Sequence, residues 1–179
     1  MKKIFGLVLL AVLFTASLAM AAELKVGDKV TDFMLKDALS GKDYTLASPE
    51  LAGRVLYIVY ASTSSSDDND HVSDALKANK DLDRLKSENK YAGLGIGNQK
   101  DSPVPNFIIN AVAKRKQEKT GSIILLDPDF SIGNTWGVPH KIATSILIDK
   151  NRTVLYIFSG KTPAENIPKI IELIKKAAK

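Results

Sequence analysis

Apolar runs alternate with polar, helix-forming segments along this chain. Three runs have the length and the β-branched, aromatic or aliphatic residues of strands that are buried on both faces of a sheet. They are Val55 to Tyr60, Leu94 to Ile96 and Ile123 to Leu126. Strands that alternate with helices need crossover connections, so the pattern predicts a sheet that contains parallel pairs.

Two helices are predicted between these strands from apolar residues at helical spacing. The first follows the polar segment after Tyr60, and acidic residues in its first turn suit the positive end of the helix dipole. It carries Val72, Ala75 and Leu76 on one side. The second begins at about Val104 and carries Ile108, Ala111 and Val112 on one face.

Both ends of the domain are predicted to contain a β-hairpin. Near the beginning, extended pieces on either side of Gly41-Lys42 form a short hairpin, and near the end 146–148 and 154–158 flank the turn 149–152. Thr162-Pro163-Ala164-Glu165 then fits a capping box with proline at the first helical position. The helix that follows repeats isoleucine at helical spacing and is predicted to lie on the sheet.

The first 21 residues have the pattern of a secretory signal peptide. Met1-Lys2-Lys3 precedes an apolar run from Ile4 to Leu18, and Ala19-Met20-Ala21 supplies the small residues of a cleavage site. We expect cleavage after Ala21 and no membrane anchor thereafter, because polar residues interrupt the run before it reaches spanning length. The expected product is a periplasmic or secreted protein in which residues 22–179 form a single domain.

Composition narrows the chemistry. The chain has no cysteine, so an exported fold of this size is expected to be held together by packing, without disulfides. The formal net charge of +5 falls to about +3 when Lys2 and Lys3 leave with the signal. The densest basic stretch, 114–119, lies at the end of a predicted helix, where the dipole favours cations. Because no basic stretch is interleaved with aromatic residues, nucleic acid is not an expected partner.

The order of these elements resembles the thioredoxin-like fold, and specifically its redoxin branch. That resemblance implies an α/β fold with a mixed central sheet flanked by helices, preceded by an N-terminal β-hairpin. The segments Val26-Gly27-Asp28 and Asp32-Phe33-Met34-Leu35 look like the redoxin opening. Trp136-Gly137-Val138 and Leu147-Ile148-Asp149-Lys150 look like its late segment.

A closer resemblance is to the YtfJ family, exported thioredoxin-like proteins of unestablished function. Thr63-Ser64 in the polar loop after the first strand, and Asp149-Lys150 before the last strand, match that family. The stretch Ser122 to Val138 and the final helix are also similar to it. Membership in this family implies a fold and a compartment but no known reaction.

Two features of active thioredoxins are absent from the positions where they belong. Ser64 and Asp67 fall near the two thiol positions of the redox loop, and a serine hydroxyl cannot form a disulfide. Ala143 stands where thioredoxins carry a cis-proline, and a cis bond before a non-proline residue costs about 2.5–4 kcal/mol, so we expect a trans bond. The resemblance therefore predicts a redoxin scaffold with no thiol oxidoreductase or peroxidase activity and no cofactor.

The leading hypothesis is a non-catalytic binding or interaction module of the cell envelope. Its expected binding surface is the polar loop at the redoxin active-site position, which we define by Thr63, Ser64, Ser65, Ser66 and Asp67, with Thr144 beside it. Hydroxyls and free N–H groups at a helix N-terminus suit a protein segment, a peptide or a small anionic ligand.

Two alternatives stay open at this point. A cysteine-independent, metal-assisted enzyme would use Asp67, Asp68, Asp70 and His71 as ligands. A helix start explains the same acids without a metal, because they interact favourably with the dipole. An accessory protein of a redox pathway would instead rely on a partner that supplies the thiols.

Three other features have a structural interpretation. A serine-based triad with His71 lacks both a nucleophile elbow and a partner geometry. The alternating glycines 93, 95 and 97 lack the spacing and lysine of a phosphate loop and instead predict close backbone approach in a strand. Trp136, which lies between apolar residues, is predicted to belong to the core.

Overall fold

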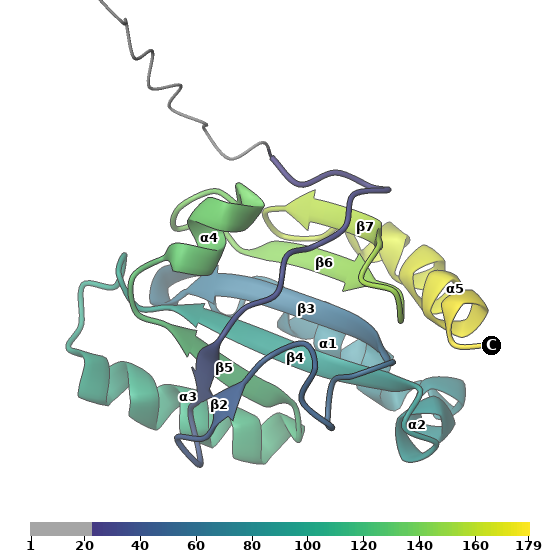
Figure 1. Cartoon of the computed structure of the whole chain (residues 1–179), viewed down its shortest axis with the longest axis horizontal. Coiled ribbons are helices and arrows are strands. Elements are labelled where there is room, and N and C mark those ends of the chain that lie inside the picture. Colours follow the sequence, from purple (N-terminus) through teal and green to yellow (C-terminus); the bar gives the residue numbers. More distant parts are fainter. Residues whose placement is uncertain (1–22) are drawn as a thin grey trace, which may run out of the picture.

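The computed structural model describes residues 23–179, and the expected signal peptide, residues 1–21, lies outside them. Within this described part, no helix is long and apolar enough to cross a membrane. A seven-stranded sheet runs through the middle of the molecule, with helices packed against it (Figure 1). Its strands are β1 (Leu35–Asp37), β2 (Asp43–Tyr44), β3 (Val55–Ser62), β4 (Tyr91–Asn98), β5 (Ile123–Asp127), β6 (Thr144–Ile148) and β7 (Val154–Ser159).

The strand order is β2-β1-β5-β4-β3-β6-β7, and the sheet is mixed. The three central strands β5, β4 and β3 are parallel to one another. The other pairs, β1 with β2, β1 with β5, β3 with β6 and β6 with β7, are antiparallel. The predicted parallel core and both predicted hairpins are therefore confirmed.

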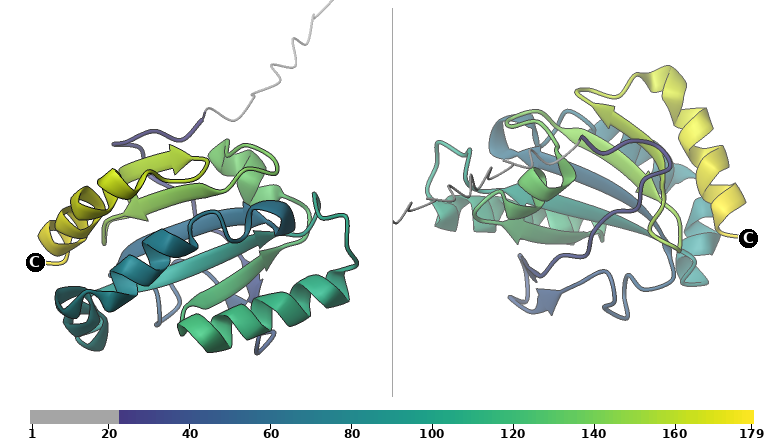
Figure 2. Two further views of the ribbon diagram at one scale, coloured as in Figure 1. Left: turned by 180° about the vertical axis from the view of Figure 1, so that it is seen from behind. Right: turned by 45° about the horizontal axis from the view of Figure 1, so that its top comes forward.

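Helices cover one face of the sheet more fully than the other. The α-helices are α1 (Asp70–Ala78), α2 (Lys80–Ser87), α3 (Asn106–Thr120), α4 (Ser131–Trp136) and α5 (Ile167–Ala177). Short 3-10 helices, η1 (Thr63–Ser65) and η2 (Ala164–Asn166), precede α1 and α5. The helices α1, α2, α3 and α5 lie on one face (Figure 2, left), whereas α4 and the N-terminal segment cover the other (Figure 1).

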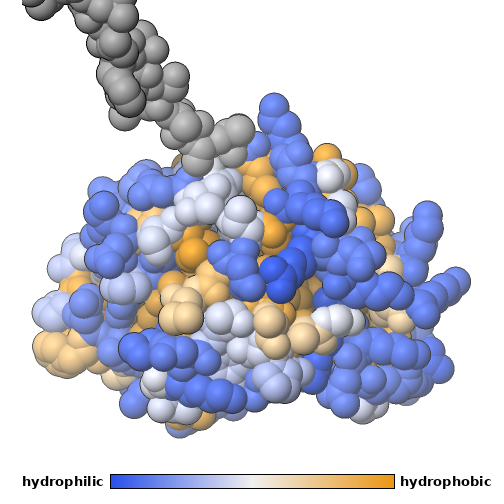
Figure 3. Space-filling model, viewed as in Figure 1, coloured by the Kyte–Doolittle hydropathy of each residue, from blue (hydrophilic) through white to orange (hydrophobic). Residues whose placement is uncertain are grey.

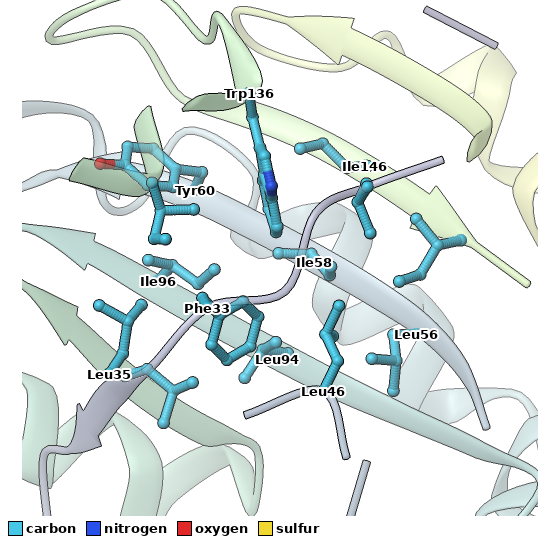
Figure 4. Close-up of a cluster of buried hydrophobic side chains, with 14 of the residues drawn as sticks. Phe33, Leu35, Leu46, Leu56, Ile58, Tyr60, Leu94, Ile96, Trp136 and Ile146 are labelled. Atoms are coloured by element: carbon cyan, nitrogen blue, oxygen red, sulfur yellow. The ribbon is translucent and has the colours of Figure 1, made fainter. Parts of the chain in front are cut away.

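The core under α4 confirms the interpretation of Trp136. This side chain is 1% exposed, and its indole packs edge-on against Phe33 with ring centroids 6.1 Å apart. Its indole N–H donates to the carbonyl of Thr31 at 3.3 Å. Figure 4 shows the ring above side chains from β3 and β4, among them Ile58 and Leu94. Trp136 therefore joins the N-terminal segment to the sheet.

The alternating glycines of β4 provide room for side chains of the neighbouring strand. A Cβ added at Gly95 would lie 3.3 Å from the Ile124 side chain, and one at Gly93 would lie 3.0 Å from the Ser122 hydroxyl. Both contacts are tighter than ordinary packing, so a side chain at either position would force its neighbour to shift. The prediction of close backbone approach agrees with this arrangement.

The predicted buried face is confirmed for α1, but α3 packs on the sheet with a different face from the one predicted. Val72 and Leu76 of α1 are buried, as expected. On α3 the buried residues are Ile109 and Ala113, and the predicted face that carries Ile108 is exposed. The first half of α3 is apolar on both sides, so periodicity alone could not select the face that meets the sheet.

Polar contacts from Gln117 explain the orientation of α3. Its amide donates to the buried Asp37 carboxylate at 2.8 Å, and its carbonyl oxygen accepts from the Ile124 N–H at 3.2 Å. Gln117 lies four and eight residues after Ala113 and Ile109, on the same stripe of the helix. These two bonds therefore place that stripe against β5 and the β1–β2 hairpin.

The predicted capping box before α5 is wrong. The Thr162 hydroxyl donates to the Ser145 hydroxyl at 3.1 Å, and Pro163 precedes η2 without a side-chain cap. Tertiary partners on β6 take the group that the local pattern assigned to the helix. The bond before Ala143 agrees with prediction, since residues 23–179 contain no cis peptide bond.

Candidate functional site

The carboxyl ends of β3, β4 and β5 meet at one edge of the sheet, and the predicted binding loop lies there. In open α/β sheets this edge is the usual place for a ligand. The loop after β3 places Ser64 and Asp67 at the surface, Thr63 and Ser66 partly buried, and Ser65 buried. The predicted loop residues are thus brought together, though they differ in exposure.

The hydroxyls of this loop mainly bond to one another. The Ser62 hydroxyl lies 2.9 Å from that of Ser64 and 3.2 Å from that of Ser65. The Ser66 hydroxyl donates to the Thr63 carbonyl at 3.2 Å. Among residues 23–179, the side-chain partner of the exposed Ser64 is Ser62 and not a base that could activate its hydroxyl as a nucleophile.

A lysine from α3 neutralises the acidic end of the loop. The Lys116 ammonium donates to the Ser66 carbonyl at 2.6 Å and lies 2.7 Å from Asp70 and 3.2 Å from Asp67. Its hydrogen bond and charge lower the pKa of the Asp67 carboxyl. Sequence reasoning treated Lys116 as one of several cations at a helix end, because no local pattern signals a contact across 49 residues.

The start of α1 is fastened to the connection between β7 and α5. The side chain of Asn69 is 1% exposed; its amide donates to the Gly160 carbonyl at 3.2 Å, and its oxygen accepts from the Thr162 N–H at 2.8 Å. His71 places its Nε2 atom 2.8 Å from the Thr162 carbonyl oxygen. These contacts hold the loop against the sheet.

The structure separates Thr144 from the exposed part of the loop. Its side chain is fully buried, and its hydroxyl lies 3.2 Å from that of Ser159. Thr144 therefore ties the ends of β6 and β7 together and presents no surface to a ligand.

The four residues of the metal hypothesis do not converge. Asp67 and Asp70 are paired with Lys116, and His71 is directed at a backbone carbonyl. Across residues 23–179, no group of three or more His, Asp or Glu side chains is placed to hold a metal ion. The arrangement instead matches the structural interpretation of acids at a helix start.

A second polar cluster at the same edge was missed by sequence reasoning. The Nδ1 atom of His140 lies 2.7 Å from the Asp101 carboxylate, which also accepts from the Asn98 amide at 2.6 Å. The imidazole stacks on Phe130 with centroids 3.8 Å apart, and 53% of the His140 side chain is exposed. Burial opposes ionisation of Asp101, but the bonds from Asn98 and His140 outweigh it and lower its pKa.

This cluster adjoins the predicted loop. The Thr63 hydroxyl lies 2.9 Å from that of Ser102, the residue next to Asp101. No local sequence pattern joins His140 to Asp101, because 39 residues separate them. Because Asp101 occupies Nδ1, the second ring nitrogen is left on the half-exposed side chain and can donate to or accept from a ligand.

Beneath these loops, Asp127 at the end of β5 fixes the scaffold. Its carboxylate is fully buried and accepts from the Tyr60 hydroxyl at 2.8 Å and from the N–H groups of Ser131 and Ile132 at 2.9 Å. Burial, followed by the charge of Asp127, raises the pKa of Tyr60. With each oxygen satisfied, Asp127 orders the start of α4 and is not a group awaiting a substrate.

Comparison with known proteins gives one family and one fold. The profile of the family YtfJ_HI0045, described as bacterial protein of unknown function, matches residues 18–177. A protein of Haemophilus influenzae described as uncharacterized is 31% identical over 148 residues, which cover 79% of this chain and 78% of that protein. The resemblance inferred from the loop and turn residues is therefore confirmed.

Solved structures with the same fold are thioredoxin-like. A putative thiol:disulfide interchange protein, DsbE, from Chlorobium tepidum superposes with a TM-score of 0.62 at 18% identity, covering 88% of this chain and 100% of that one. A putative thioredoxin from Neisseria meningitidis gives 0.59 at 22% identity, covering 83% and 91%. Peroxidoxin BcpB from Mycobacterium tuberculosis gives 0.61 at 19% identity, covering 86% and 98%. The predicted thioredoxin-like fold is confirmed, and at these identities the likeness extends to the fold alone.

Proposed function

This chain belongs to the YtfJ_HI0045 family of bacterial proteins of unknown function, and we propose that it is a non-catalytic binding module of the cell envelope. The observation that carries the proposal is a thioredoxin-like fold in a chain without cysteine. Of the two residues predicted to fall near the thiol positions, Ser64 is hydrogen-bonded to the hydroxyl of Ser62 and Asp67 is neutralised by Lys116. In the part of the chain that the structure describes, neither group has a partner that would make it a nucleophile or a redox centre.

Recognition is the activity that the remaining groups support. Ser64 is exposed, and His140 presents half of its side chain at the same edge of the sheet. The His140 ring is held by Asp101 and Phe130, so a ligand would meet a pre-positioned hydrogen-bonding group. A peptide or small anionic ligand that bonds to the hydroxyls and to this imidazole fits the surface.

The rigidity of the support also favours binding. Asn69 and Lys116 fasten the loop at two points, to the β7–α5 connection and to α3. Groups that are already fixed lose little conformational entropy when a ligand binds. The loop is therefore built as a stable platform, which suits recognition of one class of ligand.

Location in the envelope is part of the proposal and rests on the signal-peptide pattern of residues 1–21. Export would deliver a protein that begins at Ala22. The intact mass of the protein from the envelope fraction tests this point, since cleavage after Ala21 gives one defined mass. A protein that retains its first residues and stays in the cytoplasm would refute the location while leaving the binding site untouched.

The binding site is tested by nuclear magnetic resonance with isotopically labelled protein. We expect titration with glutathione, and then with a peptide library, to shift the amide signals of Thr63 and Ser64 and the imidazole signals of His140. Ser64→Ala should weaken the binding, while Ser87→Ala, which removes an exposed hydroxyl on α2, should not. Shifts confined to the distant turn at 149–152 would reject this site.

A further inference from the structure

The outer face of α3 is apolar where solvent should meet a polar surface. On α3, Phe107 is 73% exposed, Val112 46% and Ile108 39%, and Val104, two residues before the helix, is 36% exposed. These four residues occur within nine positions of one another, and Ile108 and Val112 are one helical turn apart, so the exposed apolar residues gather in one segment. We call Val104, Phe107, Ile108 and Val112 the α3 apolar patch.

This face is not needed to attach the helix to the domain. The opposite stripe, with Ile109 and Ala113, already packs on β5 and is fixed by the bonds of Gln117. A helix that is apolar all round is ordinarily buried all round. The first half of α3 therefore has a second apolar face that the described residues leave uncovered.

Both views show that this face is accessible. In Figure 2 (left), α3 lies at the margin of the helical layer, and no helix or strand of residues 23–179 covers its outer side. Figure 3 shows side chains coloured towards orange at the lower left margin, where Figure 1 draws the beginning of α3. The patch therefore forms part of the outer surface of the molecule.

The second half of the same face carries positive charge. Lys114, Arg115 and Lys119 are exposed there, with Glu118 as the acid among them. Arg115 falls seven residues after Ile108, so it continues the line of the apolar patch along the helix.

Lysines from the preceding helices add to this charge. Lys77 of α1 donates to the Lys119 carbonyl and Lys86 of α2 donates to the Gly121 carbonyl, each at 3.3 Å. Both ammonium groups therefore lie at the carboxyl end of α3. Five cations thus gather at one end of a helix whose other end is apolar.

We propose that the outer face of α3 binds the surface of an anionic membrane, with the α3 apolar patch entering the headgroup boundary and the basic end facing the lipid phosphates. The apolar patch and the cations that follow it along α3 together offer the apolar and the electrostatic contact that an anionic lipid surface takes. At about 1.5 Å per residue, α3 is roughly 22 Å long and lies flat on such a surface. The contact is independent of the polar loop, since neither Ser64 nor His140 takes part in it.

Vesicle sedimentation tests the proposal. The protein is purified in the form that the producing cells accumulate, and every variant shares that N-terminus, so differences between variants report on α3. Wild-type protein should sediment with vesicles that contain phosphatidylglycerol, should remain in solution with pure phosphatidylcholine, and should bind less at high salt. No sedimentation with the anionic vesicles would overturn the proposal.

Substitutions assign the contact to α3. Phe107→Ser with Ile108→Ser should weaken binding about tenfold or more, because two side chains no longer enter the lipid. The matched control is Met34→Ser, which removes an apolar side chain that is 73% exposed on another segment. Equal binding by the α3 variant and the control would refute the assignment.

A second pair of variants tests the contribution of the cations and leaves the apolar patch unchanged. Lys114→Gln with Arg115→Gln should weaken binding about 25-fold, since each cation near an anionic surface contributes about fivefold. Lys169→Gln with Lys176→Gln makes the same change of charge on α5 and should have a smaller effect. Sedimentation velocity without lipid is the last measurement: a dimer that the Phe107→Ser, Ile108→Ser variant abolishes would assign this face to a second copy of the chain and overturn the proposal.

Discussion

Replacing Asn69 with alanine should destabilise the domain more than its two hydrogen bonds suggest at first sight. The side chain is 1% exposed and bridges the Gly160 carbonyl and the Thr162 N–H. Its removal leaves both backbone groups without their partner in a site that water does not reach. An unsatisfied buried group costs about 1–3 kcal/mol, so we expect a loss of about 3 kcal/mol.

Asn79→Ala is the matched control for this prediction. Asn79 also accepts from two backbone N–H groups, those of Asp81 and Leu82 at the start of α2, but its position is partly exposed. Water can replace such a cap, so the expected cost is about 1 kcal/mol. Because the chemical change is the same, the difference between the two variants measures the effect of burial.

Urea unfolding followed by tryptophan fluorescence is a suitable assay. Trp136 is the only tryptophan in the chain and is 1% exposed, so its emission reports on the loss of the core. In thermal unfolding, about 3 kcal/mol corresponds to a fall of roughly 6–12 °C in a domain of this size. Equal destabilisation by Asn69→Ala and Asn79→Ala would refute the reasoning that Asn69 fastens the loop.

Three further predictions follow from the packing and the ionisable groups. Gly133→Ala should cost about 3 kcal/mol in urea unfolding, because the added Cβ would lie 2.2 Å from the ring of the buried Phe130; a near-neutral result would show that the ring can move. His140→Ala should move acid unfolding to higher pH, because it removes a partner that lowers the pKa of Asp101. The lowered pKa stabilises the domain above about pH 4, and this stability is lost as pH falls towards the folded pKa. An unchanged acid midpoint would contradict the pairing of His140 with Asp101. Burial raises the pKa of Tyr57 to about 12, so the folded state keeps this proton above pH 10 and stability should fall as pH rises through about 10–12. In an absorbance titration, Tyr57→Phe should show one phenol fewer than wild type in the late ionisation step. Full ionisation of every tyrosine near pH 10 would contradict this prediction.

Much of the fold could be predicted from local patterns. The run Val55 to Tyr60 is apolar on both faces, and the central strand β3 is covered on both faces. The isoleucines of α5 recur at helical spacing, which predicts one buried face, and Ile170 and Ile174 are fully buried. In both segments the spacing of apolar residues is compatible with one pattern of burial, and the structure shows that pattern.

Local sequence patterns gave a wrong prediction where two faces of a helix were equally apolar, or where a residue distant in sequence supplied the hydrogen-bond partner. On α3 both stripes are apolar, and the bonds of Gln117 selected the one that meets the sheet. At Thr162, partners on β6 and at Asn69 replaced the expected capping box. Neither outcome is encoded within one turn of the residue concerned.

The candidate site was predicted in part for the same physical reason. The loop at Ser64 follows β3 directly, so its place at the carboxyl edge could be derived from the strand that precedes it. Lys116 and the pair of His140 with Asp101 come from segments that meet only after folding. Their side-chain chemistry is visible in the sequence, but their proximity is set by the order of strands in the sheet.

Turnover by the pure protein is the most direct test of a thioredoxin-like scaffold that works without thiol chemistry. Purified material is assayed for reduction of insulin disulfides with dithiothreitol and for consumption of hydrogen peroxide, beside a cysteine-containing thioredoxin and a peroxiredoxin. We predict rates equal to those of buffer, because the chain has no cysteine and the side chains of Ser64 and Asp67, which are predicted to fall near the thiol positions, cannot carry electrons. Turnover above that background, in proportion to the amount of this protein and with no helper present, would contradict the account.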